Sequence, residues 1–329
     1  MARPCATHLR LWLALAGSAA FWPLAWAGEP AADPTAAAEA PPTTPTGEIL
    51  ESTRAGVRST AEWLARGVDS WFGDRPFDDG GNVTDGRLSV SFLKRQDTGM
   101  NTSVRFNAHF RLPNARKFAY LFVGRDDQRD VITDTPDAFS RQQRLLRDRP
   151  EDQAFVAGLG VRLRDAVDLR VGFRGGLKPY AQARFGRSWT YATGTVADFR
   201  ETVFWALSER FGSTTALSLE HPLTSSMAVR WLSATTITQE NPKFDWSSSL
   251  GTYRSYGDQR LLSLEALIRG IQGSGVAVAD YGVQVKWEQP IYRGWLLAEV
   301  LGGHFWPKPD ADTERGRAWA VGLTLKMRF

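Results

Sequence analysis

The last fourteen residues, GRAWAVGLTLKMRF (316–329), decide the fold class of this chain. From Trp319 onward they alternate strictly between two kinds of side chain. The first set is apolar and includes the final residue of the sequence: Trp319, Val321, Leu323, Leu325, Met327 and Phe329. The second set is small or polar: Ala320, Gly322, Thr324, Lys326 and Arg328. Because successive side chains of a strand point to opposite faces, the segment predicts a strand with one apolar and one polar face.

This segment resembles the C-terminal targeting strand of bacterial outer-membrane β-barrels, which ends in an aromatic residue that the barrel-assembly machinery reads. The resemblance implies that Phe329, together with Met327 and Leu325 on the same face, is an insertion signal. The competing interpretation is an edge strand of a soluble sandwich, but such edges usually carry charges that block further pairing. The latter half of the chain, with RFG (210–212) and VRW (229–231), is also similar to uncharacterised proteobacterial barrel proteins, which implies no activity.

The same two-residue period continues upstream to about residue 86 and predicts an all-β, transmembrane antiparallel barrel over 86–329. Each segment has about the length that crosses an outer membrane at a tilt. Fourteen strands are predicted, at 86–96, 101–112, 117–127, 153–164, 167–177, 180–191, 198–208, 213–222, 225–238, 243–255, 260–270, 278–290, 294–306 and 316–329. Region 153–191 can also be interpreted with fewer crossings, which gives twelve. Both counts are even, as expected for bacterial single-chain barrels.

The first 27 residues predict a secretory signal peptide. A basic start with Arg3 and Arg10 precedes an apolar stretch, and Ala25-Trp26-Ala27 is a cleavage motif. The mature chain is therefore predicted to begin at Gly28. The only cysteine, Cys5, is then removed, which excludes disulfides and thiolate metal sites from the mature protein. Residues 28–47 are rich in Pro, Ala and Thr and predict a disordered linker.

Residues 48–72 predict one amphipathic helix, placed on the periplasmic side within a region 48–74. Its apolar positions at helical spacing are Leu50, Val57, Leu64, Val68 and Trp71. Gly73 follows where a helix commonly ends. Three interpretations stay open: a helix docked on the barrel rim, a plug in the lumen, or a docking element for a periplasmic protein partner.

Composition narrows the choice of partners. The chain has 40 Lys and Arg against 36 Asp and Glu, and removal of Arg3 and Arg10 leaves 38 against 36, close to balance. This gives no reason to expect nucleic acid. The mean hydropathy of −0.31 is compatible with a barrel whose inward side chains and loops are polar. The expected partners are outer-membrane lipid, lipopolysaccharide and the barrel-assembly machinery.

Charged side chains occupy the predicted inward face of many strands. The set predicted to face the lumen is Arg162, Arg164, Arg170, Arg174, Arg230, Glu265, Arg269, Lys286, Glu288 and Glu299, with Arg105, Arg111 and Glu220 on the same face of their strands. One interpretation is an ion-pair lattice that closes a narrow lumen and stiffens its wall. The other is a pore lining in which the arginines of 153–177 select small anions. The alternation of acids and bases in the second half favours the lattice.

No catalytic motif emerges from the sequence, so no catalytic residue, cofactor or metal is predicted. The contexts of His109, His221 and His304 do not match the H-x-S-N signature of outer-membrane phospholipases. Asp126 and Asp127 are adjacent at a strand end, where paired acids are usually solvated. The HExxH zinc motif is missing. The function predicted is therefore a non-enzymatic outer-membrane barrel with a narrow, charged pore for small solutes, the alternatives being a lipid or lipopolysaccharide hydrolase and a structural docking protein.

Overall fold

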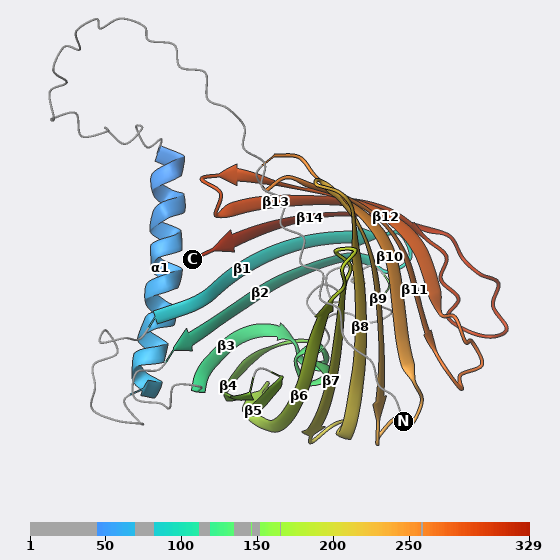
Figure 1. Ribbon diagram of the computed structural model, residues 1–329, viewed down its shortest axis with the longest axis horizontal. Coiled ribbons are helices and arrows are strands. Elements are labelled where there is room, and N and C mark those ends of the chain that lie inside the picture. Colours follow the sequence, from blue (N-terminus) through green and yellow to red (C-terminus); the bar gives the residue numbers. More distant parts are fainter. Residues whose placement is uncertain are drawn as a thin grey trace, which may run out of the picture. The chain divides into compact units, whose positions relative to one another are not determined.

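The computed structural model describes residues 45–69, 82–111, 119–134, 146, 152–164, 166–257 and 259–329. Within these ranges fourteen antiparallel strands pair in sequence order, and β1 pairs with β14 to close the barrel (Figure 1). The predicted fold class is thus confirmed, and the closed ring decides for fourteen strands over twelve. The predicted signal peptide and residues 28–44 of the predicted linker lie outside the described residues.

The strands are close to the predicted ones. The first seven are β1 (Asn82–Arg95), β2 (Gly99–Arg111), β3 (Ala119–Asp127), β4 (Gln153–Arg164), β5 (Val167–Arg174), β6 (Lys178–Thr190) and β7 (Val196–Ala206). The second seven are β8 (Arg210–Thr224), β9 (Met227–Thr238), β10 (Asp245–Ser255), β11 (Leu261–Ile271), β12 (Asp280–Tyr292), β13 (Leu296–Phe305) and β14 (Ala318–Arg328). The barrel begins at Asn82 instead of residue 86, because β1 pairs along more of β2 than the alternation indicated.

The two ends of the barrel differ in their connections. We call the end that holds Arg328 the C-terminal end and the opposite one the loop end. At the C-terminal end the turns are short: β8 ends at Thr224 and β9 begins at Met227. The loop end carries the longer connections 128–152 and 306–317, although its turns at 175–177 and 207–209 are tight. This asymmetry is typical of outer-membrane barrels, whose external loops are the longer ones.

Outward and inward faces differ as a lipid-facing wall requires. On β12, Val283 and Val285 are 44% and 47% exposed, whereas Gln284 between them is 2% exposed. The same holds for Val203 on β7, Leu250 on β10 and Leu264 on β11, which are at least half exposed. The outer surface is therefore apolar along strands from several parts of the ring. Among the described helices, none combines the length and apolar character needed to span a membrane.

The C-terminal residue lies at the seam where the barrel closes. The Phe329 backbone N–H donates to the Gly86 carbonyl at 3.1 Å, and the Phe329 ring stacks on Phe106 at 5.8 Å. A Cβ at position 86 would lie 2.5 Å from the Phe329 ring, so only glycine leaves enough space for the ring in this position. On the same strand face, Met327 is 7% exposed and Leu325 is 36% exposed.

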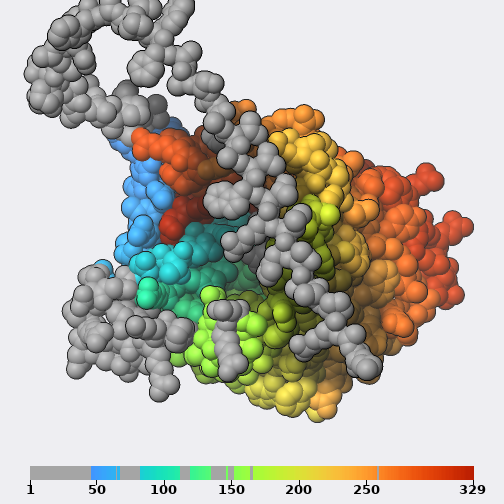
Figure 2. Space-filling model, viewed as in Figure 1, coloured from blue at the N-terminus to red at the C-terminus, as the bar shows by residue number. Residues whose placement is uncertain are grey.

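Helix α1 (Pro45–Asp69) packs against the barrel near its C-terminal end (Figures 1 and 2). It begins three residues before the predicted start, since proline is tolerated in the first turn of a helix. Its contact face centres on Ala61 and Ala65, which are buried against Ala108, Phe110, Leu121 and Val123 on the outer faces of β2 and β3. Small side chains allow this close approach. Leu50 and Val57 of the predicted apolar face are half-buried, whereas the side chains of Leu64, Val68 and Trp71 lie outside the described residues.

Candidate functional site: an inward-folded segment and its arginines

The connection 128–152 at the loop end begins with a short helix inside the barrel. Helix α2 (Gln128–Thr133) is capped by Asp127, whose carboxylate accepts from the N–H groups of Arg129 and Asp130. It ends at Asp134, whose φ of 51° and ψ of 38° place it in the left-handed region. This conformation stops the helix and turns the Asp134 side chain toward the strands. The segment therefore delivers a carboxylate into the lumen.

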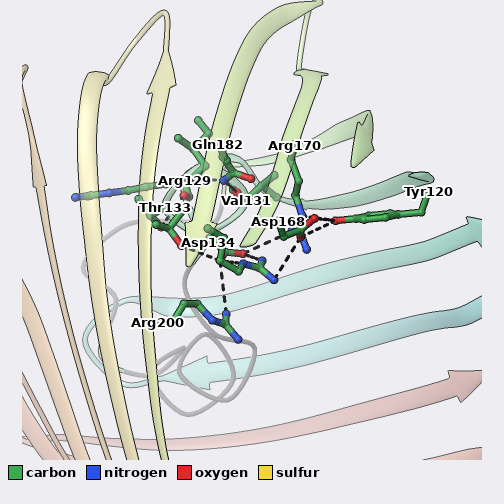
Figure 3. A network of polar contacts seen from close by, with 12 residues as sticks. Tyr120, Arg129, Val131, Thr133, Asp134, Asp168, Arg170, Gln182 and Arg200 are labelled. Carbon is green, nitrogen blue, oxygen red and sulfur yellow. Dashed lines mark hydrogen bonds and ion pairs between the residues drawn. The ribbon is translucent and has the colours of Figure 1, made fainter. Parts of the chain in front are cut away.

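Asp134 lies at the centre of a cluster of arginines from three neighbouring strands (Figure 3). Arg184 on β6 binds both of its carboxylate oxygens. The guanidinium groups of Arg170 on β5 and Arg200 on β7 lie 3.6 Å from the carboxylate. The Thr202 hydroxyl adds a hydrogen bond of 3.0 Å. A carboxylate that is 8% exposed requires this degree of compensation, because burial of an unpaired charge is costly.

A second carboxylate extends the cluster toward β3. Asp168 on β5 accepts from the Tyr120 hydroxyl at 2.7 Å and from Arg170 Nε at 3.0 Å. The Tyr120 hydroxyl in turn accepts from Arg170 Nε at 2.8 Å. Arg184 approaches the same carboxylate at 4.0 Å. Arg170 and Arg184 thus bridge Asp134 and Asp168, and the arginines outnumber the carboxylates in this cluster.

Apolar contacts, and hydrogen bonds from a side chain of the wall to backbone carbonyls of α2, hold this helix in place. Ile132 is fully buried among inward side chains that include Val156, Tyr180 and Phe204. Gln182 donates to the carbonyls of Val131 and Ile132 at 2.6 and 2.5 Å. The sequence pattern predicted a polar inner wall. The structure differs, because part of the inner wall is an apolar surface against which α2 packs.

Another part of the same connection reaches a different part of the wall. Leu146 is fully buried in a second inward cluster with Leu267, Leu301, Phe305 and Ala320 from β11, β13 and β14. Its carbonyl accepts from Arg269. Arg129 of α2 also pairs with Asp245 on β10 at 3.0 Å. The described residues of the connection, 128–134 and Leu146, therefore contact several separate sectors of the inner wall.

Two cavities border the Asp134 cluster. The larger has a volume of about 690 Å³ and lies beside β4 to β9, toward the C-terminal end of the barrel, with Arg162, Arg184, Arg200 and Arg230 among its lining residues. Its acidic residues are Asp168, Asp198 and Glu220. The smaller, of about 430 Å³, includes His109, Asp126 and Asp130. Arg184 and Arg200 line both cavities, so the cluster separates two solvent-sized spaces.

The predicted inward charges of the first half lie around these spaces. Arg162 lines the larger cavity and Arg170 joins the Asp134 cluster. Arg174 is 4% exposed and pairs with Glu209 at 2.7 Å. Arg230 pairs with Glu220, and Arg105 pairs with Asp126 at 3.2 Å. The Arg164 side chain is outside the described part of the chain.

The predicted charges of the second half form ion pairs between neighbouring strands. Glu265, which is 0% exposed, accepts from Tyr253 at 2.8 Å and pairs with Lys286 at 3.0 Å. Lys326 contacts both Glu288 and Glu299. Arg269 lies 3.5 Å from Asp245. In this half each named acid lies against a base, which corresponds to the lattice interpretation of the sequence.

Several residues of the cluster were not among the predicted ones. Arg184, Arg200 and Asp168 occupy inward positions of predicted strands, so their alternation alone gave a signal that could have found them. Asp134 gave none, because a charged residue in a long connection is ordinarily interpreted as solvated. Among the described residues, no group of three or more His, Cys, Asp or Glu side chains is arranged to hold a metal ion.

Comparison with known proteins gives only distant structural matches. No family model and no curated protein matches the chain. Among solved structures it is similar to the KdgM porin, with 7% identity and a TM-score of 0.38 over 74% of this chain and 99% of that one. It is also similar to the outer-membrane channel DcaP of Acinetobacter baumannii, with 9% identity and a TM-score of 0.45 over 76% and 98%. A third match is OmpT of Vibrio cholerae, with 11% identity and a TM-score of 0.43 over 76% and 98%. Likeness at this level says nothing about solute or mechanism, and the barrel itself is established by its strand pairing.

Proposed function

We propose that this chain is a non-enzymatic outer-membrane barrel that passes small solutes through a narrow lumen and favours anions. The C-terminal end would face the periplasm and the loop end the exterior. Insertion would use the barrel-assembly machinery, with Phe329, Met327 and Leu325 as the signal, and the apolar wall would contact outer-membrane lipid and lipopolysaccharide. The apolar outer wall and the aromatic C-terminal residue support this placement.

The observation that carries the proposal is the position of the Asp134 cluster between two cavities. Arg184 and Arg200 border both spaces, so a solute that moves between them passes their guanidinium groups. Asp134 and Asp168 offset part of this charge, which leaves three arginines against two carboxylates between the two cavities. Arginines at a constriction attract anions and oppose cations.

Single-channel recording of the folded protein in planar bilayers tests the proposal. We expect small, discrete conductance steps, and a reversal potential in a KCl gradient that shows preference for chloride. Arg184→Gln should reduce this preference, because it removes a cation from the border of both cavities. Arg254→Gln on β10 is the control, since Arg254 is exposed and lines neither cavity.

A barrel that inserts correctly but conducts no ions would contradict the pore. Equal reversal potentials for the parent and the Arg184→Gln variant would contradict the placement of the selective region. Folding of each variant is checked by its heat-modifiable mobility in electrophoresis, so that a loss of conductance is not confused with loss of the barrel.

A further inference from the structure

A third cavity lies where α1 meets the C-terminal end of the barrel, remote from the Asp134 cluster. It has a volume of about 640 Å³ and is lined by Glu51, Arg54, Gln259, Arg293, Gly294, Trp295 and Arg328. Glu51 and Arg54 come from the helix, whereas the other residues come from the turns after β10 and β12 and from the end of β14. The cavity therefore exists only when α1 is docked.

Positive charge exceeds negative charge in this cavity. Among the described residues that line it, Arg54, Arg293 and Arg328 are the cations and Glu51 is the one carboxylate. Glu51 lies 3.1 Å from Arg293 and 3.9 Å from Arg54. The terminal carboxylate follows Arg328 in the chain, and even with it the cations remain in excess. Among the described residues no ion pair to Arg328 is present.

Trp295 places a buried hydrogen-bond donor in the wall of the cavity. Trp295 is 8% exposed, and its indole Nε1–H has no partner among the described residues. The Arg54 guanidinium lies 5.2 Å from the Trp295 ring centroid, so the indole and this cation lie in the same part of the cavity wall. Burial of an unpaired donor is unfavourable, and an acceptor bound in the cavity would offset that penalty.

We propose that this cavity binds an oxyanion of the phosphate type. Several guanidinium groups and an indole N–H form a set of donors without an equal number of acceptors, and phosphate oxygens accept from both. The phosphate can belong to a lipid headgroup or be free in solution. The headgroup source is the one that the surroundings favour, because Ile291 on β12 is 49% exposed on the apolar wall beside the turn. The periplasmic location of the cavity rests on the orientation given under the proposed function.

Calorimetric titration of the folded full barrel in detergent micelles tests the site. The probes are inorganic phosphate at constant ionic strength and dihexanoyl phosphatidylglycerol below its micelle concentration, with phosphate-free dihexanoylglycerol as the control ligand. Binding of the phospholipid at least tenfold tighter than phosphate supports the headgroup source. Comparable binding of both supports free phosphate.

Variants locate the binding. The double variant Arg54→Gln with Arg328→Gln should raise the Kd at least about tenfold, because it removes two charged donors. Trp295→Phe keeps the ring and should raise the Kd severalfold. Arg254→Gln is the matched control, since Arg254 lies at the same end beside Tyr256 and should leave the Kd unchanged. No binding of either phosphate probe, or parental affinity in the double variant, would overturn the proposal. A barrel that binds phosphate but conducts no ions would refute the pore and leave this site intact.

Discussion

At the scale of single residues, the ion pair between Glu265 and Lys286 is the clearest source of stability that can be tested. Glu265 is fully buried and Lys286 is largely buried, so each charge depends on the other. Glu265→Gln should lower the free energy of unfolding by about 3–5 kcal/mol, because it leaves the ammonium group without its counter-charge. Urea titration of the folded barrel measures the loss. Combining Glu265→Gln with Lys286→Met should recover most of it, and a double variant no more stable than the single one would contradict this account.

Asp134 is the residue on which the position of α2 depends. Asp134→Asn keeps the shape of the side chain but leaves Arg170, Arg184 and Arg200 without their shared counter-charge. We expect the free energy of unfolding to fall by about 2–4 kcal/mol. The single-channel conductance should rise, because α2 is held less firmly in the lumen. Asp312→Asn in the exposed connection 306–317 is the control. An unchanged conductance and stability for Asp134→Asn would show that the cluster does not position the segment.

At the scale of elements, β12 allows its two faces to be compared in adjacent residues. Cysteine at Val285 should react with a lipid-soluble thiol reagent and resist a water-soluble one, because this side chain is on the apolar wall. Cysteine at Gln284 should react with neither, since Gln284 is buried and donates to Glu265. Val285→Arg should cost about 2–4 kcal/mol if the site lies near the bilayer midplane. Labelling of both positions by the lipid-soluble reagent to the same extent, or strong aqueous labelling at Val285, would refute the assignment of faces.

The burial of Gln284 also decides how a charged side chain would fare at this position. A wet lumen predicts that Gln284→Arg is tolerated. The structure instead places Gln284 against Glu265 and Lys286 in a packed interior, where a larger cation has no room. This substitution should therefore also destabilise the barrel.

The C-terminal strand supplies the next prediction. Removal of Phe329 should reduce the yield of folded barrel in the membrane and leave unfolded chain in the periplasm. Two effects are expected to combine: the proposed insertion signal is removed, and Phe106 and Gly86 lose their partner at the seam. Heat-modifiable electrophoresis of membrane fractions measures the folded yield. Phe329→Tyr, which keeps an aromatic ring, should retain most of it, and a normal yield after deletion would count against the insertion signal.

The sequence predicted the strands well because one face of each strand borders the outside of the barrel and the other borders its interior. The two environments favour different residues, so they produce a two-residue period along the strand. It predicted α1 less well, because the face of the helix in contact with the barrel is formed by Ala61 and Ala65, and small residues give little signal of burial. The inward segment could not be predicted. Its burial of Ile132 and Leu146 depends on inward residues from strands distant in sequence, and no local period encodes such contacts.

At the scale of the whole molecule, the interior combines two kinds of charge arrangement. Around β10 to β14, acids and bases pair across neighbouring strands, and this sector corresponds to a stiffening lattice. Around β4 to β9, arginines border open volume beside fewer acids. The ion-pair lattice and the pore lining that the sequence suggested both stay predictions, and the proposed pore uses the sector around β4 to β9.

The connection 128–152 has a mechanical consequence. Its helix α2 follows directly from β3 and is packed on the inner wall through the fully buried Ile132. Arg129 of α2 pairs with Asp245 on β10, which lies half of the ring away from β3. A hollow tube under sideways load flattens into an oval, and the walls that approach or separate most are opposite ones. A segment anchored at both walls acts as a strut, because close-packed contacts transmit strain instead of yielding to it. The lateral pressure of the surrounding bilayer would then be carried partly through the interior. The barrel would therefore resist flattening better than a tube supported by its wall alone.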